Sequence, residues 1–312
     1  MKNLPHPIQY QGSKRNLAPL ILPYFPKKVK RLVEPFSGTA AISIAAAARN
    51  ISQVFWINDL NKPLIELLQL IVEHPEDIAD AYTKIWYEQH HDSIEHYYHI
   101  REQFNRTQDP KFFLYLLARC VKGSVRYNSE GLFNQSPDKR RKGTCPETMR
   151  RNIVGMSRLL QGKCYFSSLD YQSLFHQIDR DDVVYMDPPY QGVCGDRDSR
   201  YYAGIVFPEF VNALAELNNK HIVFLISYDG RKGAKTYGET LPESLQLKKI
   251  ELEAGRSTQA TLLGREEITI ESLYLSSALL CQSSQPSTIA YIKPKGEQFI
   301  LLETYEQYPA IT

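Results

Sequence analysis

The stretch that decides the fold is Val183-Val184-Tyr185-Met186-Asp187-Pro188-Pro189-Tyr190. Its first four residues form a short apolar run, which is typical of a strand buried in a parallel sheet. Asp187 follows at the carboxyl end of that strand, where open α/β sheets bind their ligands. The two prolines lack backbone N–H groups and have a fixed φ, so the turn offers rigid carbonyls that only accept hydrogen bonds. The stretch predicts an α/β fold with a chemical site at this strand end.

Asp187, Pro188, Pro189 and Tyr190 are the predicted catalytic residues. An exocyclic amine needs in-plane acceptors for its hydrogens and an aromatic face for its ring, and these four residues supply a carboxylate, a proline carbonyl and a tyrosine. The same residues are also compatible with a strand end, a Pro-Pro turn and a core tyrosine.

Other apolar runs predict further strands of the same sheet, at residues 32–36, 54–57, 164–166 and 222–226. Small apolar residues at 40–48 predict a helix that packs closely on the sheet. Residues 246–252 and 268–270 alternate in polarity around glycines, which predicts an antiparallel pair. Residues 62–162 are mostly helical, polar and aromatic in character, and we expect them to form an inserted domain. The sheet domain would then comprise residues 1–61 and 163–312.

A second candidate site lies at the first predicted strand-turn-helix. Gly38 in Phe36-Ser37-Gly38-Thr39 allows close approach of a ligand to the backbone, and Asn58-Asp59 ends the next strand about twenty residues later. A carboxylate there can accept hydrogen bonds from both ribose hydroxyls. The single glycine, in place of G-x-G-x-x-G, favours a nucleoside over a dinucleotide. Asp59 could instead cap a helix that begins near Pro63.

Composition indicates an ordinary globular protein of 312 residues, 43% apolar and 23% charged, with a net charge of +2. It contains no apolar run of the ~18 residues that a membrane span requires, and its start lacks a signal peptide, so we expect a cytoplasmic protein. The five cysteines form no C-x-x-C pair, which argues against a zinc site and a disulfide framework. The four histidines at 90, 91, 96 and 99 lack further ligands for a metal, so we expect no metal.

Positive charge is concentrated at Lys139-Arg140-Arg141-Lys142 and Arg150-Arg151, with Glu147 as the one acid between them. A cluster of this size suits phosphate groups, although a solvated basic loop would give the same pattern.

Several of these motifs occur in the order typical of one family. Gln11-Gly12-Ser13-Lys14, Glu34-Pro35-Phe36-Ser37-Gly38-Thr39-Ala40, Asn58-Asp59 and Asp187-Pro188-Pro189-Tyr190 resemble the motifs of the Dam-type (alpha group, D12 class) DNA adenine-N6 methyltransferases. Residues 126–137, with the sequence RYNSEGLFNQSP, resemble that family's signature in its DNA-reading domain.

The resemblance implies S-adenosylmethionine as methyl donor, with S-adenosylhomocysteine as product, and no metal. It implies a Rossmann-like, mostly parallel sheet with an antiparallel last strand and an inserted helical target-recognition domain. Lys14 would lie near the carboxylate end of the donor, Asp59 would bind the ribose and Asp170 the adenine amine, unless Asp170 is only a loop and cap residue. The implied donor-binding residues are Tyr10, Gly12, Lys14, Glu34, Pro35, Phe36, Ser37, Gly38, Thr39, Asp59, Asp170 and Asp187.

The implied function is site-specific methylation of N6 of an adenine flipped out of double-stranded DNA, as an orphan methylase or beside a restriction endonuclease that acts on the same site. The expected DNA-binding residues are Arg126, Tyr127, Asn128, Phe133, Asn134, Lys139, Arg140, Arg141 and Lys142. The stretch 126–128 could instead only pack the inserted domain. The segment 255–265 differs from that of the GATC-methylating members, so their target sequence is not transferred. N4-cytosine methylation, RNA or protein methylation, and a non-catalytic DNA-binding subunit remain alternatives.

Overall fold

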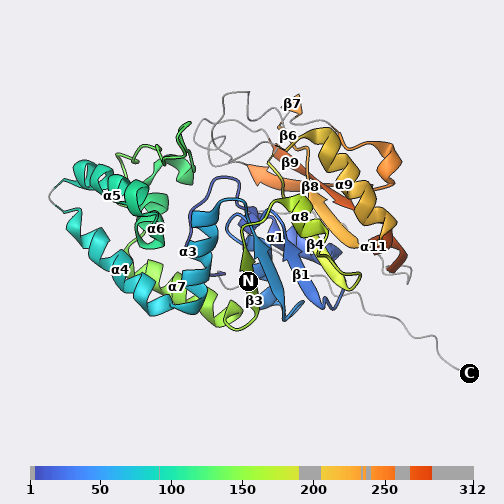
Figure 1. Ribbon diagram of the computed structural model, residues 1–312, viewed down its shortest axis with the longest axis horizontal. Helices are drawn as coiled ribbons and strands as arrows, with labels where there is room; N and C mark the ends of the chain where they lie inside the picture. The colour runs from blue at the N-terminus through green and yellow to red at the C-terminus, as the bar shows by residue number, and fades with distance from the viewer. Residues whose placement is uncertain are drawn as a thin grey trace, which may run out of the picture.

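One mixed sheet forms the centre of the protein in a computed structural model that describes residues 4–90, 92–189, 205–232, 235–236, 240–256 and 268–282 (Figure 1). Its long strands are β1 (Arg31–Glu34), β2 (Phe55–Asn58), β3 (Cys164–Ser167), β4 (Asp182–Met186), β5 (Val223–Ser227), β8 (Lys248–Arg256) and β9 (Ile268–Leu275). Two short strands follow β5: β6 (Arg231–Lys232) pairs with β9, and β7 (Lys235–Thr236) pairs with β6.

The strand order is β3-β2-β1-β4-β5-β9, and β8 pairs with the other side of β9. The first five strands are parallel, whereas β9 runs antiparallel to both β5 and β8. The predicted α/β fold with a mostly parallel sheet and an antiparallel last strand is therefore confirmed. The order of strands along the chain reverses between β1 and β4, and such a reversal opens a ligand crevice at the carboxyl ends of the strands.

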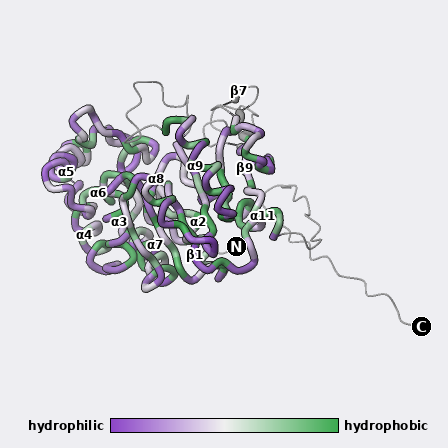
Figure 2. Tube along the Cα trace, turned by 45° about the vertical axis from the view of Figure 1, so that its right-hand side comes forward, coloured by the Kyte–Doolittle hydropathy of each residue, from purple (hydrophilic) through white to green (hydrophobic). Residues whose placement is uncertain are grey.

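Helices cover both faces of the sheet because successive residues of each strand point to opposite sides. Leu32 of β1 and Val183 of β4 pack toward α1 (Ala18–Ile21), α2 (Ala41–Ala48) and the flanking turns η1 (Lys14–Asn16) and η2 (Leu22–Tyr24). Val33 and Val184 pack toward α8 (Tyr171–Phe175), α9 (Phe207–Asn219) and η4 (Glu243–Leu245) on the opposite face. Leu279 of the short helix α11 (Ser277–Gln282) belongs to the first core. Figure 2 shows apolar segments running through the middle of these layers.

Helices fill the chain between β2 and β3, as expected. They are α3 (Lys62–Glu73), α4 (Pro75–Glu88), α5 (Ser93–Thr107), α6 (Pro110–Arg119) and α7 (Pro146–Leu160), with the turn η3 (Val121–Gly123). Asn61, Asp92 and Asp109 cap three of them with their side chains, and a proline opens the first turn of most.

The inserted helices share their core with the sheet. In Figure 1, α3 and α7 lie next to the strands, whereas α4, α5 and α6 lie farther to one side. The buried apolar residues of these helices join the same continuous cluster as Leu32 and α2. The domain limits at residues 62 and 162 therefore remain predictions. Within the described ranges, no helix has the length and apolar character needed to cross a membrane.

Candidate active site

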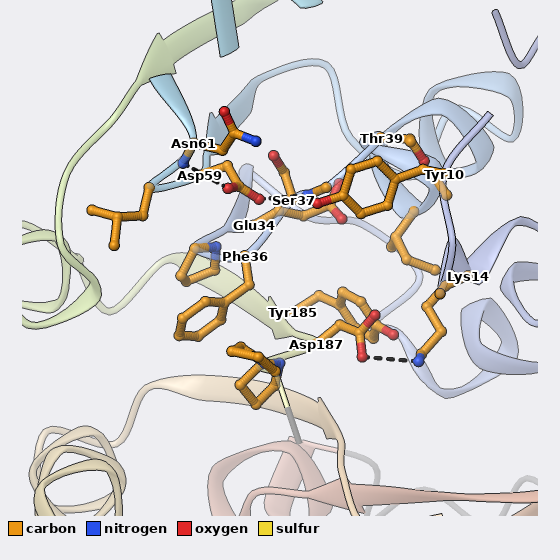
Figure 3. Close-up of a pocket in the computed structure, with 18 of the residues that line it drawn as sticks. Tyr10, Lys14, Glu34, Phe36, Ser37, Thr39, Asp59, Asn61, Tyr185 and Asp187 are labelled. Atoms are coloured by element: carbon orange, nitrogen blue, oxygen red, sulfur yellow. Dashed lines mark hydrogen bonds and ion pairs between the residues drawn. The ribbon is translucent and has the colours of Figure 1, made fainter. Parts of the chain in front are cut away.

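A cavity opens at the carboxyl ends of β1, β2 and β4, beside the N-terminal segment 10–14 (Figure 3). Every residue expected to bind a methyl donor lines it: Tyr10, Gly12, Lys14, Glu34, Pro35, Phe36, Ser37, Gly38, Thr39, Asp59, Asp170 and Asp187. Pro188 and Pro189 line it as well, and Tyr190 lies outside the described residues. Residues that were not predicted as site residues complete the wall: Gln11, Ser13, Ala41, Ile42, Leu60, Asn61, Leu169, Tyr171, Tyr185 and Ile205.

Asp59 ties the turn after β1 to the end of β2. Its Oδ2 accepts a hydrogen bond from the backbone N–H of Gly38 at 2.9 Å, and its Oδ1 accepts one from Asn61 N at 2.9 Å. Gly38 has a φ of 50°, a conformation that favours glycine. Burial raises the pKa of Asp59, and the two backbone donors oppose that rise. The alternative that Asp59 caps the next helix is wrong, because the capping side chain of α3 belongs to Asn61.

Asn58 joins the loops that follow β1 and β3 through a fully buried amide. Its Nδ2 donates to the carbonyl oxygens of Pro35 and Leu169, both at 2.9 Å. Its Oδ1 accepts from Ser167 Oγ at 2.7 Å and from Leu169 N at 2.8 Å. All four hydrogen-bonding positions of the amide are thus occupied. Since Pro35 and Leu169 both line the cavity, this side chain fixes two of its walls.

Asp187, which is half-buried, forms an ion pair with the buried Lys14 of the N-terminal segment. Lys14 Nζ lies 2.9 Å from Asp187 Oδ1, and Figure 3 shows this contact at the end of the cavity away from Asp59. Burial raises the pKa of Asp187 to about 6; Lys14 lowers it and Glu271 of β9 raises it. Glu271 was not predicted as a site residue. Its Oε2 lies 3.6 Å from Lys14 Nζ.

Glu34 ends β1 beneath the cavity and is only 2% exposed. Its Oε1 accepts a hydrogen bond from Ser43 N in the first turn of α2, at 2.8 Å. Burial raises the pKa of Glu34 to about 7, an effect that the hydrogen bonds from Ser43 oppose. This carboxyl group therefore anchors the first turn of the helix that follows.

Asp170 lies at the edge of the cavity and also caps α8. Its Oδ1 accepts a hydrogen bond from Gln172 N at 2.9 Å. Asp170 therefore does act as a helix cap, which was the alternative that the sequence left open. A carboxylate oxygen can accept more than one hydrogen bond, so this cap is compatible with a ligand amine as a further donor.

The segment 126–134 folds back on itself, and it separates the expected DNA-binding residues into two groups. Tyr127 and Phe133 pair across an antiparallel bridge, and both are buried, at 5% and 0% exposure. The hydroxyl of Tyr127 donates to Asn61 Oδ1 at 3.2 Å. The expectation that Tyr127 and Phe133 contact DNA is corrected by this arrangement, because their rings lie in the core of the inserted helices.

The polar residues of the same hairpin remain near the surface. Arg126 and Asn134 are exposed, and Asn134 N donates to Arg126 O at 3.0 Å. Asn128 is half-buried, and its Oδ1 holds the tip by accepting from the backbone N–H groups of Glu130 and Leu132. The inward aromatic and outward polar residues alternate as in a strand, a signal that the sequence carries.

The basic cluster 139–142 is exposed on a loop that interior side chains hold by its backbone. Arg119, 1% exposed, donates to Asp138 O at 2.9 Å, Gln89 donates to Lys142 O at 3.2 Å, and the hydroxyl of Tyr82 donates to Thr144 O at 2.6 Å. Arg141 pairs with Asp138 at 2.7 Å.

Arg150 does not extend the basic cluster. It bonds to Glu76 and Asp80 of α4 and so joins α7 to α4. Its charge serves helix packing, a role that spacing along the chain does not reveal.

No histidine or cysteine that the structure describes lines the cavity. His96 Nε2 contacts the carbonyl of Ile85 at 2.9 Å, and His91 lies outside the described residues. Among the residues that the structure describes, no group of three or more His, Cys, Asp or Glu side chains could hold a metal. Cys120, Cys145, Cys164 and Cys281 are free thiols.

Residues 10–255 match the model of the D12 class N6 adenine-specific DNA methyltransferases. The chain belongs to this family. The family acts on adenine in DNA, which supports the adenine interpretation and not the N4-cytosine alternative.

Relatives with assigned names agree with the family. The DNA adenine methylase of Haemophilus influenzae is 29% identical over 230 residues, covering 70% of this chain and 78% of the relative. The DNA adenine methylase of Escherichia coli K12 is 28% identical over 229 residues, covering 70% and 79%. The type II methyltransferase M.FokI of Planomicrobium okeanokoites is 24% identical over 230 residues; these cover 71% of this chain but only 35% of that longer protein.

Among solved structures, the rRNA methyltransferase AviRa of Streptomyces viridochromogenes covers 89% of this chain and 90% of its own, with a TM-score of 0.41 and 15% identity. That TM-score is too low to support an argument about fold or function.

Proposed function

We propose that this protein transfers a methyl group from S-adenosylmethionine to N6 of an adenine flipped out of double-stranded DNA. The observation that carries the proposal is the half-buried carboxylate of Asp187, which borders the same cavity as Asp59 and is followed directly by two prolines. Family membership gives the base and the atom. The geometry supports the roles of the individual residues.

The cavity has the polar groups that a nucleoside donor needs. Asp59 already accepts two backbone N–H groups, but each carboxylate oxygen can accept a further hydrogen bond, so ribose hydroxyls fit there. Phe36, Leu60 and Leu169 add apolar surface suited to a purine ring, and Asp170 lies at the edge as an acceptor for its amine. S-adenosylmethionine would supply the methyl carbon as an electrophile bonded to a positively charged sulfur.

Asp187 and Pro188 would activate the target amine. The lone pair of adenine N6 is delocalised into the ring, so N6 is a poor nucleophile until acceptors draw on its two hydrogens. We assign one hydrogen to Asp187 and the other to the carbonyl oxygen of Pro188. Lys14 keeps Asp187 oriented by the ion pair at 2.9 Å. Alignment and charge stabilisation would supply most of the rate, without a covalent enzyme intermediate.

Double-stranded DNA would approach over the inserted helices. Arg126, Asn134 and the basic cluster 139–142 are exposed, and they offer charge for phosphates and donors for base edges. Flipping the target adenine out of the duplex costs a few kcal/mol, which binding in the pocket offsets. Because Tyr127 and Phe133 are buried, the side chain that fills the vacated space must come from elsewhere.

The direct test is product analysis. Purified protein, S-adenosylmethionine labelled in the methyl group and unmethylated plasmid DNA should give labelled N6-methyladenine in the nucleoside digest. Labelled N4-methylcytosine, or label only in RNA or protein, would refute the proposal. Sequencing of modified bases on the same plasmid then gives the target sequence.

A matched pair of variants tests the role of Asp187. Asp187→Ala should abolish transfer while the donor and DNA still bind, because the lost contact matters most as N6 reacts. Asp181→Ala removes a carboxylate that is 66% exposed and paired with Lys30, and it should retain full activity. A variant at 187 that keeps more than about a tenth of wild-type turnover, a loss below ~1.4 kcal/mol, would exclude Asp187 as the key acceptor.

A further inference from the structure

The buried ammonium group of Lys14 forms ion pairs with two carboxylates. Its side chain is 8% exposed, and its Nζ lies 2.9 Å from Asp187 Oδ1 and 3.6 Å from Glu271 Oε2. The side chains of Asp187 and Glu271 are themselves only 21% and 17% exposed. Because little solvent screens these charges, each carboxylate changes the free energy of ionisation of the other carboxylate and of the ammonium group.

The fold builds this arrangement from three distant segments. Lys14 lies in η1 directly after Ser13, whose Oγ is hydrogen-bonded to Thr39 Oγ1 at 3.0 Å. Glu271 lies on the central part of β9, on the sheet face from which Leu273 and Leu275 enter the larger core. Strand pairing on both sides holds β9, so the position of the Glu271 carboxylate is set by the sheet.

Other titratable groups also face Asp187. Burial raises the pKa of Glu34 of β1 to about 7, and the nearby charge of Asp187 adds to this rise. Tyr185 of β4 carries a buried hydroxyl at 2.7 Å from Ser227 Oγ, and burial together with Asp187 raises the pKa of this phenol. Both pKa values are thus shifted toward the neutral form. Lys14 and Glu271 are therefore the charges that act most directly on Asp187.

We propose that Glu271 is a positioning residue for methyl transfer: it holds the Lys14 ammonium between two carboxylates and so limits how strongly that ammonium stabilises ionised Asp187. This inference rests on the proposed function, in which Asp187 accepts an N6 hydrogen. By this arrangement Glu271 sets the pH range over which Asp187 is an active acceptor, although Glu271 does not itself line the cavity.

Substitutions of Glu271 and of Lys14 should shift the pH profile of methyl transfer in opposite directions. Glu271→Gln removes one of the two carboxylates beside Lys14 and the negative charge that opposes ionisation of Asp187, so the acidic limb of kcat should move to lower pH by about one unit. In Lys14→Gln, Asp187 loses its cation, and the limb should move to higher pH. Single-turnover methylation of unmethylated plasmid DNA at saturating donor, from pH 5 to pH 9, measures both. Glu253→Gln, an exposed carboxylate on the adjacent strand β8, is the control and should leave the profile unchanged.

A direct titration separates this inference from the proposed function. Carboxyl ¹³C NMR of the full chain follows the Asp187 resonance, which its loss in Asp187→Asn assigns. Glu271→Gln should lower the Asp187 midpoint whether or not the protein methylates DNA. An unchanged midpoint in a folded Glu271→Gln protein would overturn the inference, as would shifts of Glu271→Gln and Lys14→Gln in the same direction. A lowered midpoint without any methylated product would refute only the proposed function.

Discussion

Replacing Asn58 with alanine should damage both the stability of the protein and its affinity for the donor. The amide makes four hydrogen bonds between 2.7 and 2.9 Å, and Asn58 is fully buried. At about 1 kcal/mol net for each bond, the loss in unfolding free energy amounts to about 4 kcal/mol, which is large against a typical total of ~5–15 kcal/mol.

The same substitution releases Pro35 and Leu169, which both line the cavity. We therefore expect the KM for S-adenosylmethionine to rise at least about tenfold, equivalent to ~1.4 kcal/mol of binding, while kcat at saturating donor falls less. Asn58→Asp keeps the two acceptor contacts but sets a carboxylate oxygen against the carbonyls of Pro35 and Leu169. It should be as damaging as the alanine variant at neutral pH.

Urea unfolding followed by circular dichroism measures the first effect, and titration calorimetry with S-adenosylmethionine measures the second. Asn219→Ala, at an exposed position at the end of α9, should remain within about 0.5 kcal/mol of wild type. If Asn58→Ala also unfolds within about 0.5 kcal/mol of wild type and binds the donor equally well, the amide does not hold the cavity walls.

Four further outcomes follow from the site and the basic loop. Asp59→Ala should weaken donor binding by about 1–3 kcal/mol in calorimetry, since ribose hydroxyls and two backbone N–H groups lose an acceptor; unchanged affinity would exclude a ribose role. Wild-type kcat should rise as pH increases through about 6, because the raised pKa of Asp187 keeps it protonated below that value. With the pKa of Glu34 raised to about 7 in the folded state, folding binds a proton, so wild-type stability falls as pH rises from 4.5 toward 7; Glu34→Gln should remove this fall in urea titrations. Replacing Lys139 and Arg140 with alanine should weaken all duplexes alike and reduce the salt slope of binding by about two units, whereas a loss confined to one sequence would indicate base reading.

The sheet could be predicted because its local signals and its tertiary environment agree. Buried parallel strands require continuous apolar runs, and residues 183–186 and 222–226 carry them, so β4 and β5 were located to within a residue or two. The polar strand ends at Asn58-Asp59 and Asp187 mark the ligand edge by the same logic, since side chains after parallel strands meet at one edge of the sheet.

Contacts between segments that are distant in the sequence were harder to predict. Nothing near Glu271 in the sequence indicates that β9 brings it to Lys14, because that depends on the insertion of an antiparallel strand beside β5. The predicted strand there ended at residue 270, whereas β9 continues to Leu275.

Motif and charge patterns in the inserted helices did not show which side chains point inward or pair with other helices. Tyr127 was predicted to contact DNA together with its polar neighbours, with packing of the inserted domain as the alternative. Alternation along the hairpin sends its ring inward, as that alternative requires. Arg150 was counted with other cations, because its acidic partners lie seventy or more residues earlier, on α4.

The loop that carries the basic cluster 139–142 is held by hydrogen bonds from interior side chains to its backbone carbonyl oxygens. Arg119, Gln89 and Tyr82 each hold a carbonyl oxygen, and a carbonyl is present whatever side chain its residue bears. Residues 139, 140 and 142 can therefore vary in evolution, or in the laboratory, without loss of the loop conformation. The hydrogen bonds that shape the loop are thus separate from the side chains that we propose to contact DNA, so substitutions at these three positions should change affinity and salt dependence without altering the cavity.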